Sequence, residues 1–189
     1  MSLPAPQDED PHLLIGRLRA DVARLEQRIE DLDRLAHHDS LVPLPNRRGF
    51  VRQLERMIAR VDRYGDDAAL LFIDVDGLKS VNDSFGHHAG DAALIHVAQV
   101  LVDEVRKSDV VARFGGDEFT VLLERADSAQ AFDTALRLTN AIAGARFVHE
   151  GQVIPLSAAI GVTSIVAGDK ADAVLTRADR AMYEEKAAA

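Results

Sequence analysis

Two adjacent carboxylates, Asp117 and Glu118, follow the glycine pair Gly115-Gly116 in the middle of the chain. Short apolar runs on both sides predict a β-hairpin joined at the two glycines. Glycine has no Cβ, so a ligand can approach the backbone closely there. Neighbouring carboxylates cannot both be buried without a cation. The segment therefore indicates a nucleotide or metal site at a hairpin tip, and an ordinary solvated acidic turn is the alternative.

A second pair of carboxylates, Asp74 and Asp76, ends a continuous apolar run over residues 68–75. Such a run predicts a central strand that is buried on both faces. Carboxylates at the end of a buried strand are costly unless they bind something. Hard oxygen ligands with this spacing suit Mg²⁺, which prefers one or two carboxylates plus substrate phosphates. The alternative is a pair of strand-end residues exposed to water.

Polar residues after this strand are candidates for contact with a nucleotide. Lys79 could meet a phosphate. Asn82 and Asp91 could read a base edge, because Asp accepts from paired N–H donors such as those of guanine, whereas Asn both donates and accepts. The chain has no G-x-x-x-x-G-K-[ST] segment, so it is not a P-loop protein.

The elements that must position these residues follow from the hydrophobic periodicity. Strands are predicted over residues 68–75, 110–112, 120–123, 146–149 and 152–162. Helices are predicted from Asn46 to about Arg63 and over residues 92–105, 129–143 and 169–186, with a short helix and a helix start between 77 and 91. This order indicates an α/β (α+β) fold, in which a mixed, mainly antiparallel sheet is flanked by helices.

The N-terminal helix, predicted from Pro11 to His37, carries a heptad seam. Its apolar residues keep a seven-residue register with charged residues between them: Ile15, Leu18, Val22, Leu25, Ile29, Leu32 and Ala36. This pattern favours a parallel coiled coil, and hence a homodimer, over an amphipathic helix folded back on the domain. Pro43 and Pro45 are expected to end this helix and to force an extended linker.

The composition limits the class of protein. The chain has 189 residues, 47% hydrophobic and 28% charged, which is enough for one full core plus an appendage. There is no cysteine, no apolar run of the ~20 residues that span a bilayer, and no visible signal peptide, so a cytoplasmic location is the default. The net charge of -9 argues against nonspecific nucleic-acid binding. Residues 1–10 are expected to be disordered, and both ends look like the boundaries of a fragment from a larger protein.

From about Leu35 to Lys186 the chain resembles the GGDEF domain, the diguanylate cyclase family. Five motifs occur in the family's order: Asp39-x-Leu41 with Leu44-Pro45-Asn46-Arg47-Arg48-x-Phe50; Asp74-x-Asp76-x-Leu78-Lys79 with Asn82-Asp83, Phe85-Gly86-His87 and Gly90-Asp91; Arg113-Phe114-Gly115-Gly116-Asp117-Glu118-Phe119; Ser157-Ala158-Ala159-Ile160-Gly161; and Ala178-Asp179 with Ala181-Met182-Tyr183 and Lys186. The heptad pattern thus assigns the coiled-coil helix to residues 11–37, and the resemblance assigns the cyclase domain to residues 38–189.

The resemblance implies a palm-like, ferredoxin-like fold related to nucleotide cyclases and polymerases. It implies a dimer that condenses two GTP into cyclic di-GMP and two pyrophosphates. Asp74, the Val75 carbonyl and Asp117 would hold Mg²⁺, with Mn²⁺ also open, while Asp117 would serve as base and Glu118 would assist. The residues expected to bind substrate are Asn82 and Asp91 on guanine, and Lys79, Gly115, Gly116 and Lys186 at the phosphates.

The resemblance also implies a product-inhibition site at Arg106-x-x-Asp109, five residues before the glycine pair. Arg106 and Asp109 would bind guanine and phosphate of cyclic di-GMP, and Arg137 is a candidate second arginine. A surface salt bridge at a helix end is the alternative. The chain departs from the family at two places. Val42-Pro43 stands where Thr-Gly is usual, which would stiffen the linker, and Gly77 stands where a larger residue is frequent. The family usually continues after Lys186 to a Gly-Arg-Asn, whereas this sequence stops at Ala189.

Two other functions stay open. A non-catalytic cyclic di-GMP receptor or dimerisation module would have no need of Asp74, Asp117 and Glu118. A cyclase that uses ATP in one half-site is disfavoured by Asp91, because a carboxylate there repels the acceptor edge of adenine. In the leading interpretation, an upstream sensor domain would act through the coiled coil to control the cyclase.

Overall fold

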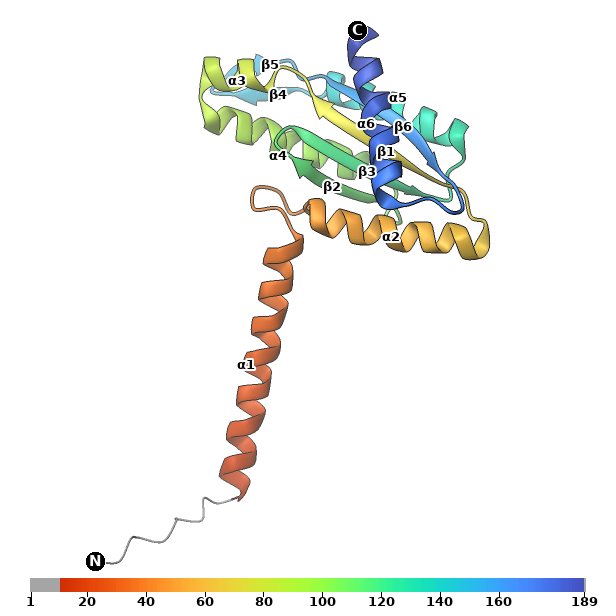
Figure 1. Ribbon diagram of the computed structural model, residues 1–189. Coiled ribbons are helices and arrows are strands. Elements are labelled where there is room, and N and C mark those ends of the chain that lie inside the picture. The colour runs from red at the N-terminus through yellow and green to blue at the C-terminus, as the bar shows by residue number, and fades with distance from the viewer. Residues whose placement is uncertain (1–10, 189) are drawn as a thin grey trace, which may run out of the picture. The chain divides into compact units, whose positions relative to one another are not determined.

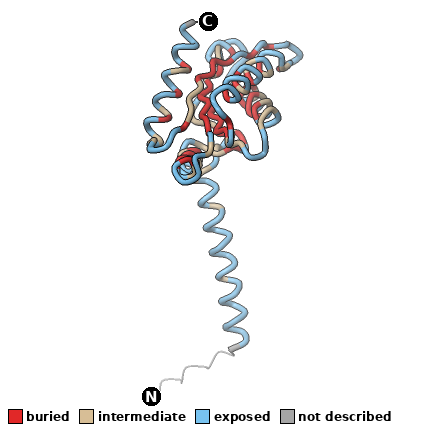
Figure 2. Tube along the Cα trace, turned by 90° about the vertical axis from the view of Figure 1, so that its right-hand side faces the viewer, coloured by how far each residue is buried: buried red, intermediate tan, exposed pale blue. Residues whose placement is uncertain are grey.

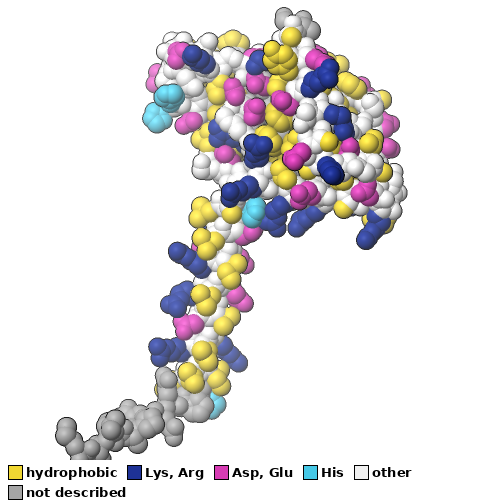
Figure 3. Space-filling view, viewed as in Figure 1, with side chains coloured by type: hydrophobic (Ala, Val, Ile, Leu, Met, Phe, Trp, Pro, Cys, Tyr) yellow, Lys and Arg dark blue, Asp and Glu magenta, His cyan; other side chains and the backbone are white. Residues whose placement is uncertain are grey.

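The computed structural model describes residues 11–188, and the chain divides into two compact units, one up to Ala36 and one from His37 onward. The first unit is α1 (Pro11–His37), a single helix with the predicted bounds. Figure 2 shows α1 exposed along almost its whole length, and in Figure 3 its apolar side chains alternate with charged ones. Among residues 11–188, no helix has the length and apolar content that a membrane span requires.

The second unit is built on a four-stranded sheet with the order β2-β3-β1-β6 (Figure 1). Its strands are β1 (Ala68–Val75), β2 (Val110–Gly115), β3 (Glu118–Glu124) and β6 (Ala158–Ile165). Each pairing between these strands is antiparallel, so within the described chain the expected mixed sheet is antiparallel throughout. This order, with helices on both faces, confirms the predicted ferredoxin-like class.

Each face of the sheet is covered by its own pair of helices. On one face, α2 (Arg47–Tyr64) and α6 (Ala171–Ala188) share a buried cluster with Leu70 and Phe72 of β1. On the other face, α4 (His87–Glu104) and α5 (Ser128–Gly144) share a second cluster with Leu71 and Ile73. Successive residues of β1 thus alternate between two cores, and the strand is buried on both faces as predicted.

The strand predicted over residues 152–162 is wrong as a single element. The structure divides it into β5 (Gln152–Ile154), which pairs with β4 (Phe147–His149) in a separate two-stranded sheet, and β6. The break falls at Pro155, which lies with Leu156 and Ser157 outside both strands. Proline has no N–H to give to a ladder, so it ends the pairing at this point.

The extended linker predicted before α2 is also wrong. α1 ends at His37, six residues before Pro43, and residues 38–46 form a closed loop that we call the interhelix loop. His38 and Pro45 form a β-bridge, and the Asn46 N–H donates to the His37 carbonyl at 2.9 Å. The prolines therefore sit inside a folded turn. Asn46 caps α2 as predicted, because its side chain accepts from the Gly49 N–H.

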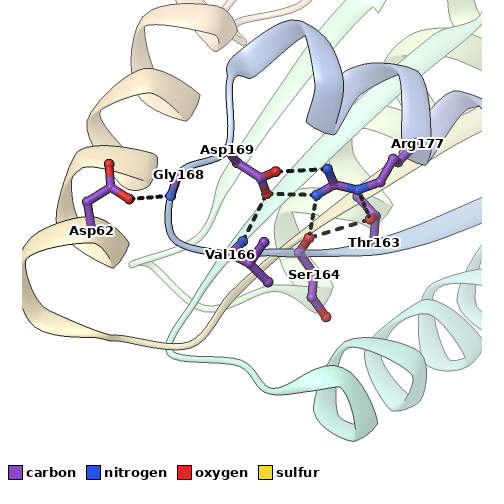
Figure 4. A network of polar contacts seen from close by, with 7 residues as sticks. All are labelled: Asp62, Thr163, Ser164, Val166, Gly168, Asp169 and Arg177. Atoms are coloured by element: carbon purple, nitrogen blue, oxygen red, sulfur yellow. Dashed lines mark hydrogen bonds and ion pairs between the residues drawn. The ribbon is translucent and has the colours of Figure 1, made fainter.

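A network of polar contacts fixes the start of α6 against the end of β6 (Figure 4). The Arg177 guanidinium donates to both oxygens of Asp169, at 2.9 and 2.7 Å, and to the Ser164 carbonyl at 3.0 Å. The Gly168 N–H donates to Asp62 of α2 at 2.8 Å. The Arg177 side chain holds the pKa of Asp169 below its ordinary value, although burial opposes this. The ion pair therefore helps to set the angle at which α6 leaves the sheet.

Gly161 sets how closely α6 lies on β6. A Cβ added to Gly161 would stand 2.1 Å from the backbone nitrogen of Met182 and 2.4 Å from the Ala178 carbonyl oxygen. No real side chain fits in that space, so the helix backbone rests directly on the strand. This close approach positions the C-terminal turns of α6, which carry Lys186.

Candidate functional site

The two strands that carry the central carboxylates are neighbours. In the pairing of β1 with β3, Asp74 lies directly opposite Glu118. Opposite residues of an antiparallel pair point to the same face of the sheet. That face is the one covered by α2 and α6. Leu70 and Phe72 stand at every second position before Asp74 along β1, so they point to the same side, and both belong to the buried cluster that α2 and α6 share. Side chains 44 positions apart in the sequence therefore meet at one end of the sheet.

The turn between β2 and β3 differs from the prediction by one residue. Its two residues are Gly116 and Asp117, while Gly115 is still in β2 and Glu118 begins β3. The register shifts between Arg113 and Gly115, and this irregularity moves the turn one residue along the chain. Asp117 thus lies in the turn itself. Its carbonyl accepts the Val75 N–H at 3.0 Å, which ties the turn to the end of β1.

Lys186 of α6 reaches into this group of carboxylates. Its ammonium donates to Asp74 Oδ1 at 2.5 Å and lies 4.0 Å from Asp76 Oδ1. The contact with Asp74, helped by the charges of Asp76 and Asp117, raises the pKa of Lys186. Lys186 was expected at a phosphate, whereas here it neutralises strand-end carboxylates, 112 residues away in the sequence.

Glu118 lies among other acids. Burial raises its pKa first, and the charges of Asp117, Asp179 and Asp74 add to the shift, while Arg47 opposes them. Asp179 and Arg47 matched family motifs but were not predicted as site residues. Arg47 lies over the Phe114 ring, 4.8 Å from its centroid, at the start of α2. The packing of α2 and α6 on this face brings Arg47 and Asp179 near Glu118. The residues next to each of them in the sequence do not indicate this proximity.

The donor set agrees with a hard divalent cation. No three His, Asp or Glu side chains between residues 11 and 188 are grouped closely enough to hold a metal ion by themselves. Mg²⁺, however, usually takes one or two carboxylates and fills its other positions with water and substrate phosphates. Asp74, Asp117 and the Val75 carbonyl are oxygen donors of that type. The ammonium of Lys186 on Asp74 shows that the site already accommodates positive charge there.

Asn82 and Asp91, the predicted base-reading pair, are brought together by two helices. Asn82 lies on α3 (Leu78–Phe85) and Asp91 in the first turns of α4. A Cβ added to Gly90 would stand 2.1 Å from Asn82 Oδ1, so the missing side chain makes room for the Asn82 amide beside Asp91. Asn82 is half-buried and Asp91 exposed, which leaves the pair open to a ligand. Lys79, also on α3, is exposed.

The predicted product site occupies the turn between α4 and β2. Asp109 accepts the Arg106 N–H at 3.0 Å and the Glu124 N–H at 3.2 Å, so the carboxylate fixes the turn to β3. Arg106 is exposed. Arg137 of α5 comes to the same corner but pairs with Glu104, whose carboxylate it meets at 2.8 Å and whose carbonyl it also contacts. Glu104 therefore holds Arg137 at this corner through Nη1.

The family described as "Diguanylate cyclase, GGDEF domain" matches residues 36–189. Diguanylate cyclase TpbB of Pseudomonas aeruginosa is 38% identical over 180 residues, which covers 94% of this chain and 41% of TpbB. Diguanylate cyclase DgcP of the same species is 36% identical over 174 residues, with 92% of this chain and 26% of DgcP covered. The chain thus spans about a quarter to two fifths of these relatives' lengths.

Among solved structures, the coiled coil and GGDEF domain of DgcB from Caulobacter crescentus, in complex with c-di-GMP, is similar to this chain. The TM-score is 0.88 at 25% identity, and the match covers 95% of this chain and 96% of that chain.

Proposed function

This chain belongs to the GGDEF diguanylate cyclase family, and we propose that it condenses two GTP into cyclic di-GMP and two pyrophosphates. One observation carries the proposal: Asp74 and Glu118 face each other across β1 and β3, and Asp117 lies in the adjoining turn, bonded to Val75. Such a group of acids is costly to maintain unless it binds cations and phosphates. The similarity to two named diguanylate cyclases supports the same reaction.

The metal-binding residues would be Asp74, Asp117 and the carbonyl of Val75. Mg²⁺ is the expected ion, and Mn²⁺ is the alternative with similar ligand preferences. When bound, the ion would neutralise triphosphate charge and polarise the α-phosphate.

The reaction needs a proton acceptor beside the attacking hydroxyl. The 3′-oxygen of one GTP forms a bond to the α-phosphorus of the other, and the bond from that phosphorus to the bridging oxygen breaks, which releases pyrophosphate. The hydroxyl proton passes to Asp117, and Glu118 lies next to it. A second attack in the opposite direction closes the ring.

Binding residues surround this centre. Asn82 and Asp91 would read the guanine edge, with Lys79 and the backbone of Gly115 and Gly116 at the phosphates. Lys186 has a double role, because its ammonium balances Asp74 in the absence of substrate. The triphosphate offers it a stronger acceptor, and a move onto the phosphate frees Asp74 Oδ1 as a ligand.

Each subunit supplies half of the site, so catalysis requires a homodimer, and α1 provides the means. Its large apolar side chains are all at least 40% exposed, including every heptad position except Ala36: Leu13, Leu14, Ile15, Leu18, Val22, Leu25, Ile29, Leu32 and Leu35. β-Branched residues at one core position, with Leu at the other, favour two parallel strands. A coiled coil would hold the half-sites at high effective concentration, and an upstream sensor could control activity through it.

The test is incubation of the purified protein with Mg²⁺ and GTP, followed by mass identification of the product. We expect cyclic di-GMP from the unmodified chain and at least about 100-fold less from Asp74→Asn. Asp133→Asn on the exposed surface of α5 is the matched control and should keep full activity. No product from a dimeric chain that still binds cyclic di-GMP would identify a receptor. A mixed product from GTP plus ATP would identify the alternative cyclase.

Product inhibition at Arg106 and Asp109 is the second part of the proposal. It is supported by the exposed arginine, the fixed carboxylate and the bound c-di-GMP in the similar DgcB structure. Arg106→Ala should abolish inhibition by added cyclic di-GMP and leave the initial rate unchanged. Persistent inhibition in that variant would place the regulatory site elsewhere.

A further inference from the structure

Only a few bonds hold the turn that carries Asp117. The β2–β3 ladder resumes at the pair Gly115 and Glu118, so Gly116 and Asp117 lie outside it. The Asp117 carbonyl accepts from Val75 on one side. On the other side the Arg113 guanidinium donates to the Gly116 carbonyl twice, from Nε at 3.1 Å and from Nη2 at 2.8 Å. The Gly116 carbonyl belongs to the peptide that joins Gly116 to Asp117, so Arg113 sets the orientation of that peptide.

The same guanidinium has a second acceptor, far away in the sequence. Its remaining terminal nitrogen, Nη1, donates to Asp39 Oδ1 at 3.1 Å, across a separation of 74 residues. The side chains of Arg113 and Asp39 are only 15% and 18% exposed, so solvent screens this ion pair much less than an open surface pair. Asp39 lies in the interhelix loop, two residues after the end of α1.

Hydrogen bonds to Asp39 hold the interhelix loop together. Oδ1 of Asp39 also accepts the N–H groups of Leu41 and Val42, at 2.9 and 3.0 Å. The Asp39 N–H donates to the Leu44 carbonyl, and Val42 and Leu44 are buried. Burial alone would raise the pKa of Asp39, but the two amides and Arg113 outweigh it and lower the pKa.

Backbone hydrogen bonds connect the interhelix loop to β2 and to the last residue of α1. The Arg113 N–H donates to the Pro45 carbonyl at 3.0 Å, and the Asn46 N–H donates to His37, the last residue of α1. The loop is therefore bonded to β2 by the backbone and side chain of one residue. Any rearrangement at the end of α1 that moves the loop must move Asp39, and with it the guanidinium that holds Gly116.

We propose that Arg113 is a positioning residue, which makes the orientation of the catalytic turn depend on the interhelix loop and so on the end of α1. The inference rests on the proposed function. Arginine suits this role because its planar fork reaches two acceptors on opposite sides at once. Lysine carries the same charge but could serve only one acceptor well.

The experiment compares Arg113→Lys and Asp39→Asn with the unmodified chain and with the control Arg146→Lys, at an exposed arginine before β4. Asparagine can still accept the Leu41 and Val42 N–H groups, so Asp39→Asn removes the ion pair and keeps the loop fold. We expect Arg113→Lys to lower kcat by about 10- to 100-fold, because misplacement of a reacting group by about 1 Å has this effect. KM for GTP should change much less than kcat, because of the proposed binding groups only the Gly115–Gly116 backbone adjoins Arg113, whereas Asn82, Asp91, Lys79 and Lys186 lie on other elements.

The second readout is amide hydrogen exchange of the segment 114–119, measured with and without GTP. Both variants should exchange faster there than the unmodified chain and the control, and Asp39→Asn should lower kcat in the same direction. Unchanged kcat and turn exchange in Arg113→Lys would overturn the proposal. So would an Asp39→Asn variant whose exchange rises in residues 39–45 alone. An inactive unmodified chain would refute the proposed cyclase instead, and the exchange comparison would still test Arg113.

Discussion

Gly161→Ala should separate α6 from the sheet. The added methyl carbon would stand 2.1 Å from Met182 N and 2.4 Å from Ala178 O, whereas ordinary contacts begin at 3.4 Å. Both atoms are helix backbone, so no side chain can rotate away, and α6 must retreat by about 1 Å. Overpacking of a core typically costs 1–3 kcal/mol, and a rigid backbone obstacle puts this change at about 3 kcal/mol. For a domain of this size, that corresponds to a fall in Tm of roughly 6–12 °C.

The assay is thermal unfolding followed by circular dichroism, with turnover of GTP measured at a temperature where the variant is folded. Turnover should fall about 10- to 100-fold, because α6 carries Lys186, whose ammonium lies 2.5 Å from Asp74. Gly144→Ala is the control: no atom lies within 4 Å of its Cβ, and it is helical, so its Tm should stay the same or rise slightly. If Gly161→Ala has the same Tm as Gly144→Ala, the argument that helix backbone fills the space beside Gly161 is refuted.

Three further perturbations test other parts of the molecule. Gly90→Ala would place a Cβ 2.1 Å from Asn82 Oδ1, the end of a movable side chain, so KM for GTP should rise about 5- to 10-fold with little change in Tm. Asp169 has a pKa lowered below 3.8 by Arg177, so its stabilisation is complete above that value and is lost as the pH falls through the lowered pKa. Urea titrations should therefore show Asp169→Asn less stable than the unmodified chain at about pH 6, and this difference should shrink as the pH falls below 3.8. Leu25→Lys in the heptad seam should give monomers by sedimentation and should reduce specific activity most at low protein concentration.

The sequence predicted best those elements whose cause is local. β1 was predicted from its unbroken apolar run, and the structure gives it the same bounds, Ala68–Val75. The cap of α2 at Asn46 also depends on a few adjacent residues. The undivided strand over 152–162 overlooked a signal that was present, because Pro155 cannot donate to a ladder. The position of the turn at Gly116 and Asp117 depends on a register shift, which the types of the adjacent residues do not predict.

What the sequence could not supply is the set of contacts between distant segments. Asp74 was predicted as a metal ligand from its place at a strand end, but nothing near it indicated that Lys186 would reach it across 112 residues. That contact requires the close approach at Gly161, which acts through packing and leaves no charge pattern to recognise.

The same is true of Arg113. It belongs to one of the matched family motifs, but its bond to Asp39 depends on a loop that is folded and that was predicted to be extended. Proline was interpreted as a helix terminator, yet its fixed backbone angle is equally suited to a closed turn. The error in the loop and the omission of Arg113 therefore have one cause. The acceptor that gives Arg113 its second bond exists only when residues 38–46 fold back on β2, so a chain with a truly extended linker would leave the catalytic turn independent of α1.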